Sequence, residues 1–312
     1  MTNNLQTTSN ILMVRPANFG FNEQTAGNNA FQTLDTSLDA KEISKKAIEE
    51  FDLFVDKLRN AGVNVVVVED SPNPVKPDSI FPNNWVTFHN DGTIITYPMY
   101  APVRRLERNE AIIEQIEQHF EIKKRQHLEH FEDSNRFLEG TGSMILDRVN
   151  NIVYACISPR TDSLLLDKFC ELTEYRKMVF HAVDANGQDI YHTNVMMALG
   201  ETFVIICLET IRNETERKEL LKCFSETGKE VIEISMKQML SFAGNMLQLR
   251  TNKNETLLVM SEQAFQSLES DQIAAIKRHT NILYSSIETI ETYGGGSTRC
   301  MMAEIFLPVR NK

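Results

Sequence analysis

The sequence lacks the features that define several other classes of protein. No apolar run approaches the roughly 20 residues that cross a bilayer. The first ten residues, MTNNLQTTSN, lack the positive start and apolar run of a secretory signal. The formal net charge is −11, and no stripe of lysine and arginine interrupts it, so the chain would repel a polyanion such as DNA. We therefore expect a cytoplasmic protein that binds neither membranes nor nucleic acids.

Paired metal-binding and disulfide-forming residues are also missing. The five cysteines are odd in number and include no CxxC pair, which argues against a disulfide framework and a structural zinc site. The seven histidines form no HxH or HxxxH pair, so we expect no metal, and nothing indicates another cofactor. Cys156 and Cys207 lie in apolar runs typical of a core, whereas Cys300 follows the run GGGSTR.

What the sequence does have is a period of about fifty residues. Five short polar or glycine-rich motifs each run into an apolar segment: FPNNWVTF (81–88), LEGTGSMIL (138–146), YHTNVMMAL (191–199), FAGNMLQL (242–249) and GGSTRCMMAEIF (295–306). If one polar residue in each motif is taken as a marker, the intervals between markers are 55, 53, 53 and 55 residues. These markers are Asn84, Glu139, His192, Asn245 and Cys300.

The same order of elements is expected after each of the first four markers. A short strand, a turn and a second apolar run predict a hairpin. An amphipathic helix follows, as at 106–119 or 261–278, and then a further strand, as at 65–68 or 177–180. Repeated ββαβ modules predict an α/β propeller of five blades with pseudo-fivefold symmetry, formed by one domain over residues 1–312. Evenly spaced turns also arise by chance in α/β proteins, but the repeated element order favours a propeller.

The repeat gives the markers a chemical meaning. If each marker precedes the first strand of its module, all five lie at one end of the propeller and converge on its axis. Glu139, His192 and Cys300 together suit nucleophilic catalysis by a thiolate, and the glycine run before Cys300 and the adjacent Arg299 would favour the thiolate form. Each of the three also has an ordinary explanation, as a turn residue, a core histidine or a buried small side chain.

At these residues the sequence resembles the pentein superfamily of guanidino-group-modifying enzymes. The resemblance is carried by EGTG at 139–142, HTN at 192–194 and GGGSTRC at 294–300, and it extends from Val14 to Pro308. Arg15-Pro16, FNEQTAGNN at 21–29 and FPNNW at 81–85 make it most similar to the amidinotransferase-related or citrulline-utilisation hydrolase branch. The resemblance implies the same five-bladed fold, a small amino-acid substrate and a homodimer.

The resemblance also implies roles for individual residues. Cys300 would be the nucleophile that forms a covalent intermediate with loss of ammonia, His192 the general acid and base, and Glu139 the group that holds the substrate nitrogens. Arg160, in ISPRTD, would bind the α-carboxylate of the substrate through its forked guanidinium. Asp78, in PDSIF, would contact the substrate, and Asn28 is a further candidate contact.

Two amides depart from the pattern of the deiminases. Asn84 and Asn194 stand where deiminases carry aspartates that pair with a guanidinium, so a cation should bind less well here. An amide both donates and accepts, which suits a neutral ureido group such as that of citrulline. We therefore expect a cysteine hydrolase that converts citrulline to ornithine, ammonia and carbon dioxide. An arginine deiminase, a dihydrolase and an amidinotransferase are the alternatives, and a non-enzymatic pentein is disfavoured because all three catalytic residues are present.

Overall fold

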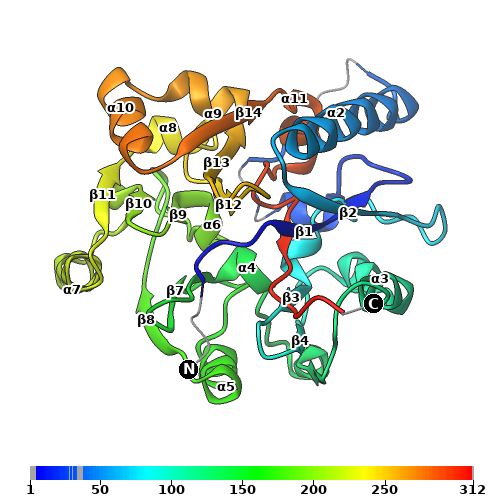
Figure 1. Ribbon diagram of the computed structural model, residues 1–312, viewed down its shortest axis with the longest axis horizontal. Helices are drawn as coiled ribbons and strands as arrows, with labels where there is room; N and C mark the ends of the chain where they lie inside the picture. Colours follow the sequence, from blue (N-terminus) through cyan, green and yellow to red (C-terminus); the bar gives the residue numbers. More distant parts are fainter. Residues whose placement is uncertain (1–4, 28, 30, 34–37, 311–312) are drawn as a thin grey trace.

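The computed structural model describes residues 5–27, 29, 31–33 and 38–310. Within these ranges the strands form five sheets of three strands each, arranged around a common centre (Figure 1). Four sheets follow the chain in order. They are β3 (Val86–Phe88), β4 (Thr93–Thr96) and β5 (Lys124–His127); β6 (Ile145–Asp147), β7 (Ile152–Cys156) and β8 (Arg176–Phe180); β9 (Met197–Leu199), β10 (Phe203–Ile206) and β11 (Glu230–Glu233); and β12 (Leu247–Arg250), β13 (Thr256–Ser261) and β14 (Asn281–Ser285).

The fifth sheet joins the two ends of the described chain. β1 (Asn10–Arg15) lies in its middle, antiparallel to β15 (Ala303–Glu304) and parallel to β2 (Asn64–Glu69). Each of the other sheets has the same pattern, in which the middle strand is antiparallel to the first and parallel to the third. The predicted α/β propeller of ββαβ modules is therefore confirmed, and the last module is completed by the N-terminal strand.

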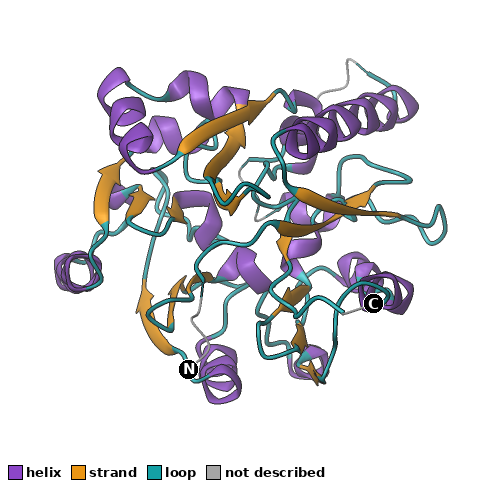
Figure 2. Cartoon of the chain, in the orientation of Figure 1, coloured by secondary structure: helices purple, strands orange, loops and turns teal. Residues whose placement is uncertain are grey.

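Helices cover the outside of the sheets, and some of the short helical segments lie near the centre (Figure 2). The outer helices are α2 (Ala40–Asn60), α3 (Glu110–Glu117), α5 (Ser163–Thr173), α7 (Glu214–Glu226), α9 (Glu262–Ser267) and α10 (Ser270–His279). The remaining helical segments are α1 (Glu23–Ala26), α4 (Gly140–Ser143), α6 (Thr193–Met196), α8 (Met236–Leu240), α11 (Glu288–Gly294) and the 3-10 turns η1 (Pro82–Asn84), η2 (Pro102–Glu107), η3 (Glu129–Ser134) and η4 (Leu208–Thr210).

The hydrophobic core lies between each sheet and its outer helix. In the second blade, Leu165 and Phe169 of α5 are buried against Val153 and Ala155 of β7. These side chains alternate with exposed ones, so α5 has one apolar face. That face packs against the sheet and covers its apolar side chains. No helix in the described part of the chain is both long enough and apolar enough to cross a membrane.

Two predicted helices are interrupted in the structure. The segment 106–119 contains the end of η2 and then α3, which restarts where the side chain of Asn109 accepts a hydrogen bond from the amide of Ala111. The segment 261–278 divides into α9 and α10, because Leu268 is extended and Glu269 forms a capping box at the start of α10. The predicted strands at 65–68 and 177–180 are each within one residue of β2 and β8.

Candidate active site

The five marker residues occupy equivalent places in the five blades. Asn84 ends η1 before β3, Glu139 and His192 are the N-caps of α4 and α6, Asn245 precedes β12, and Cys300 lies in the turn before β15. The first strands of neighbouring blades contact one another around the centre, as β3 does with β15 and β6 with β9. The short helices α4 and α6 lie near the middle of the molecule (Figure 1). The expected convergence at one end of the propeller thus has a structural basis.

Glu139 and His192 form a buried pair. The Nε2 atom of His192 lies 2.7 Å from Oε2 of Glu139, while Oε1 of Glu139 accepts a hydrogen bond from the amide of Tyr100 at 2.9 Å. Two guanidinium groups approach the same carboxylate, at 3.6 Å from Arg160 and 4.0 Å from Arg104. Burial would by itself raise the pKa of Glu139, but Arg160, His192 and Arg104 outweigh it and lower that pKa to about 2.

His192 is neutral near pH 7. Burial lowers its pKa to about 4, because Glu139 only partly offsets the loss of water and the repulsion from the two arginines. With Glu139 ionised, Nε2–H of His192 donates to the carboxylate, so Nδ1 carries the lone pair. The pair therefore orients a base whose free nitrogen can receive and return a proton.

Two amides hold the sulfur of Cys300. Nδ2 of Asn245 lies 3.3 Å from Sγ and Nδ2 of Asn194 lies 3.4 Å from it, and only 5% of Cys300 is exposed. Asn245 is itself fixed, since its Oδ1 accepts the amide of Arg299. The side chain of Arg299 turns away to Glu304, at 2.7 Å, so the donors at the sulfur are amides and not the adjacent arginine that the sequence suggested.

The glycine run forms one wall of the site. A Cβ atom on Gly294 would lie 2.9 Å from Cζ of Phe81, and Gly295 has a φ of +61°, which glycine adopts without strain. The carbonyl of Gly295 accepts hydrogen bonds from the hydroxyl of Tyr191 at 2.9 Å and from Nδ2 of Asn29 at 3.4 Å. These contacts fix the backbone close to the cavity, where a bulkier residue would fill it.

Asn84 has one buried polar atom without a hydrogen-bond partner. Its Oδ1 accepts from Nη1 of Arg104 at 2.9 Å, whereas its Nδ2 is buried without a hydrogen-bond partner. Arg104 is held by Glu107 through two hydrogen bonds of 2.8 and 2.9 Å. Gly142 leaves room for this arrangement, because a Cβ there would lie 2.3 Å from Nδ2 of Asn84 and 2.8 Å from Nδ1 of His192.

The remaining expected residues lie around the same narrow cavity, with one exception. Asp78 is buried, accepts from Nδ2 of Asn22 at 2.7 Å, and has a second oxygen without a hydrogen-bond partner. Burial raises the pKa of Asp78. Arg160 lies with its guanidinium 4.8 Å from the ring centre of Tyr191. Asn28 lies outside the described residues, but its neighbour Asn29 lines the cavity.

The cavity is lined mostly by residues that the sequence either identified or placed next to a motif. The lining residues are Thr25, Asn29, Asp78, Phe81, Asn84, Arg104, Arg160, Tyr191, His192, Gly294, Gly295, Gly296 and Cys300. Two predicted site residues are not among them: Asn194 is buried against the sulfur, and Glu139 is bonded to His192. No group of three or more acidic, histidine or cysteine side chains that could hold a metal ion occurs in the described ranges.

Several of these residues, among them Tyr191, Asn29 and Arg104, escaped the sequence analysis. Tyr191 and Asn29 lie inside quoted motifs, YHTN and FNEQTAGNN, so their positions next to recognised site residues were a usable signal. Arg104 gave no such signal, because the run PVRRLER contains three arginines of which only one turns inward. Its role follows from η2, which brings Arg104 back against η1.

Solved structures of other enzymes have a similar fold. An arginine dihydrolase from the ornithine–ammonia cycle in cyanobacteria, ArgZ, matches with a TM-score of 0.72 and 13% identity over 96% of this chain. This chain covers 41% of the full ArgZ chain, and 98% of its N-terminal domain in a substrate-bound variant, with a TM-score of 0.74 and 13% identity. A dimethylarginine dimethylaminohydrolase variant with an S-methyl-L-thiocitrulline adduct matches with a TM-score of 0.65 and 15% identity, over 96% of this chain and 100% of its own.

The sequence itself shows the family. No curated protein matches the chain. The family model described as N,N dimethylarginine dimethylhydrolase, eukaryotic, matches residues 15–307, which is most of the chain and includes all five markers. The structural likenesses, at 13–15% identity, agree with it in fold. The protein therefore belongs to the N,N dimethylarginine dimethylhydrolase family of the pentein superfamily.

Proposed function

We propose that the protein hydrolyses citrulline to ornithine, ammonia and carbon dioxide through a covalent intermediate on Cys300. The observation that carries this proposal is the state of Asn84. Its oxygen is occupied by Arg104 and its buried Nδ2 has no partner, so Asn84 offers the cavity a donor and no free acceptor. A buried donor requires an acceptor on the ligand. The ureido group of citrulline has a carbonyl oxygen, whereas a guanidinium has none.

The other polar groups complement the rest of a ureido amino acid. The free oxygen of Asp78 and the ionised carboxylate of Glu139 can accept from ureido N–H groups. The guanidinium of Arg160 lines the cavity and suits the α-carboxylate, since its fork matches a carboxylate in two hydrogen bonds. Tyr191 packs against that guanidinium and limits its movement.

The first half of the reaction forms a carbon–sulfur bond. The sulfur of Cys300 attacks the ureido carbon, and its proton passes to Nδ1 of His192 as the carbonyl oxygen gains charge beside Nδ2 of Asn84. The tetrahedral adduct collapses when the terminal C–N bond breaks. His192 gives its proton to the leaving nitrogen, which departs as ammonia, and an S-carbamoyl thioester with ornithine attached through nitrogen is left on Cys300.

The second half of the reaction restores the enzyme. Water gives a proton to His192 and its oxygen attacks the same carbon. The C–S bond breaks, the sulfur of Cys300 recovers the proton, and the carbamic acid of ornithine leaves. This acid loses carbon dioxide to give ornithine, so one citrulline and one water yield one ornithine, one ammonia and one carbon dioxide. Glu139 keeps His192 in the required orientation throughout.

A product assay with purified protein tests the proposal. Incubation with citrulline should release ornithine and ammonia in equal amounts, and Cys300→Ser should abolish the release. Asn245→Ser, which keeps the nucleophile but removes one donor to its sulfur, is a matched control and should retain part of the activity. If citrulline stays intact while arginine is consumed, the ureido assignment is wrong; if Cys300→Ser retains full turnover, the covalent mechanism is wrong.

The carboxylates favour a second candidate, an arginine dihydrolase. Asp78 lines the cavity and Glu139 lies directly against His192, which also lines it; carboxylates of this kind suit a cationic guanidinium. Arginine would then give ornithine, two ammonia molecules and carbon dioxide, with two waters consumed. The ratio of ammonia to ornithine separates the candidates, because it is one for citrulline and two for arginine.

A further inference from the structure

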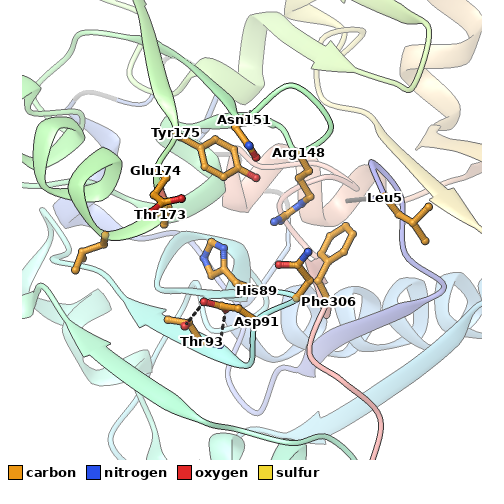
Figure 3. A pocket seen from close by; sticks show the side chains of 12 residues that line it. Leu5, His89, Asp91, Thr93, Arg148, Asn151, Thr173, Glu174, Tyr175 and Phe306 are labelled. Carbon is orange, nitrogen blue, oxygen red and sulfur yellow. Dashed lines mark hydrogen bonds between the residues drawn. The ribbon is translucent and has the colours of Figure 1, made fainter. Parts of the chain in front are cut away.

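A second cavity lies at the other end of the strands that carry the active site (Figure 3). It has a volume of about 200 Å³. Its residues His89, Arg148 and Phe306 follow β3, β6 and β15, the same strands that Asn84, Glu139 and Cys300 precede. The strands therefore separate the two cavities, and the second one has no part in the chemistry described above. Its size corresponds to roughly seven water molecules, enough for a small organic ion.

Arg148 is a buried cation without a full counter-charge. Only 5% of it is exposed, its Nε has no hydrogen-bond partner, and one face of its guanidinium packs on the ring of Phe306 at 3.9 Å. Within the described residues its ion-pair partner is Glu304, at 3.8 Å. That carboxylate lies much closer to the buried Arg299, at 2.7 Å, so two arginines share one acid. A buried charge in this state favours an added anion.

The surroundings of Arg148 suit an anion that is partly apolar. Figure 3 shows the ring of His89 and the hydroxyl of Tyr175 on one side of the guanidinium, and Leu5 and Phe306 on the other. His89 adds no charge near pH 7, because burial and the nearby Arg148 lower its pKa to about 3.

The acidic residues of the lining oppose an anion only weakly. Asp91 is exposed, and its two oxygens already accept from the amide and the hydroxyl of Thr93 at 2.9 and 2.8 Å. Glu174 is exposed at the mouth of the cavity, where water screens its charge. The buried end of the cavity therefore keeps the positive character of Arg148.

We propose that this cavity binds a small organic carboxylate, held by the guanidinium of Arg148 and the hydroxyl of Tyr175, with its carbon chain against Leu5 and Phe306. A carboxylate matches the planar fork of arginine in two parallel hydrogen bonds, and it carries the apolar part that the lining accommodates. A tetrahedral inorganic anion would match the charge but leave the apolar side of the cavity unused.

Calorimetric titration of the full chain with sodium propionate, with sodium chloride as the salt control, tests this site. Arg148→Gln should weaken propionate binding by roughly tenfold or more, because it removes charge-assisted hydrogen bonds. Arg148→Lys should retain part of the affinity, since it keeps the charge and loses the fork. Tyr175→Phe, which removes only a hydroxyl on a half-buried ring and so keeps the fold, should weaken binding by a smaller factor.

Arg160→Gln is the matched control, since Arg160 is one of the two arginines that line the active-site cavity. Propionate binding that survives Arg160→Gln and falls with Arg148→Gln and Tyr175→Phe supports the proposal. Binding that is lost with Arg160→Gln and unaffected by Tyr175→Phe would overturn the proposal. A heat of titration with propionate no larger than the heat with chloride would also overturn it. Inorganic phosphate that binds more tightly than propionate, and depends on Arg148, would overturn the assignment to a carboxylate.

Discussion

At the scale of single residues, the site depends on which partner each polar atom already has. Glu139 uses one oxygen for the backbone amide of Tyr100 and the other for His192, so both of its oxygens already have a partner within the protein. The Oδ1 atom of Asn84 already accepts a hydrogen bond from Arg104, whereas its Nδ2 has no hydrogen-bond partner. The preference proposed for a ureido substrate therefore rests on which hydrogen-bonding atoms are free as well as on net charge.

The pH dependence of the free energy of unfolding should reveal the lowered pKa of the buried His192. His192 takes up a proton at about pH 4 in the folded protein but near 6.5 in the unfolded chain, so the unfolded state gains protons first as the pH falls. Stability should drop between pH 6.5 and 4 by on the order of 3 kcal/mol from this residue. Glu139, with a pKa of about 2 in place of 4.5, extends the loss below pH 4.5.

Urea unfolding at several pH values checks this prediction. His89, whose pKa falls to about 3, adds to the slope in the same direction, so His192→Gln should reduce the slope between pH 6.5 and 4 without abolishing it. His130→Gln, at an exposed histidine, is the control and should leave the slope unchanged. A slope that is the same in wild type and His192→Gln would contradict a buried neutral histidine.

Asn84→Asp should reverse the preference between ureido and guanidino substrates. The carboxylate can still accept from Arg104, but it has no N–H to offer the developing oxyanion of citrulline. Loss of such a donor lowers kcat by about 100-fold or more. Steady-state assays should show kcat/KM for citrulline falling by about that factor while arginine becomes the better of the two substrates. Unchanged kinetics with citrulline would show that Nδ2 of Asn84 does not contact the reacting group.

The sequence could predict which residues meet but not how each one points. Glu139, His192 and Cys300 were identified from their equal spacing, because the repeat decides where the chain returns to the centre. The orientation of Asn194 toward the sulfur, and of Arg299 away from it, depends on neighbours that spacing does not reveal. Arg104 was missed for the same reason, since only the folding of η2 against η1 brings it to Asn84.

At the scale of elements, the short helices α4 and α6 fix the positions of the site residues because they are tightly packed. α4 contains Gly142 between Asn84 and His192, where there is no space for a side chain. Its N-cap is Glu139, and Thr193 at the start of α6 donates to the carbonyl of Ser143 at 2.6 Å. A change in either helix should therefore move Glu139 and His192 together.

Gly142→Ala should reduce activity far more than it reduces stability. The added methyl group would lie 2.3 Å from Nδ2 of Asn84 and 2.8 Å from Nδ1 of His192, so both must move by part of an ångström. Displacements of about 1 Å near the chemistry can cost about 100-fold in rate. Gly20→Ala, where an added Cβ has no atom within 4 Å, should keep wild-type kcat. Near-normal kcat in Gly142→Ala would show that this loop does not position the pair.

Helix boundaries were harder to predict than strands. The strands are separated by turn signals, so β2 and β8 were placed to within a residue. The apolar period continues through Leu268 and Asn109, whereas the backbone stops and restarts there because local capping groups satisfy the new helix ends. The spacing of apolar residues indicates which face of a helix is buried. It does not indicate where one helix ends and a second begins when both bury the same face.

At the scale of the whole molecule, one blade links the two ends of the chain. β1 pairs with β15 on one side and β2 on the other, and β15 begins three residues after Cys300. The sequence predicted five modules but did not reveal that the N-terminal strand completes the last one, since no motif marks that pairing. The position of Cys300 thus depends on a strand near residue 10. The homodimer expected from the family resemblance stays a prediction.

Leu12→Ala should test whether this closing blade supports the entire fold. Leu12 is fully buried in β1, pairs with Ala303 of β15, and belongs to the same core cluster as Trp85. Removing its side chain should lower the free energy of unfolding by about 2–5 kcal/mol. Because the blades share contacts around the centre, Trp85 fluorescence and far-ultraviolet circular dichroism should report one transition in urea, shifted equally by the substitution.

Leu53→Ala, at a side chain of α2 that is 63% exposed, should leave the midpoint nearly unchanged. A loss below about 1 kcal/mol, or a separate early transition seen only by Trp85, would mean that the closing blade unfolds independently of the others.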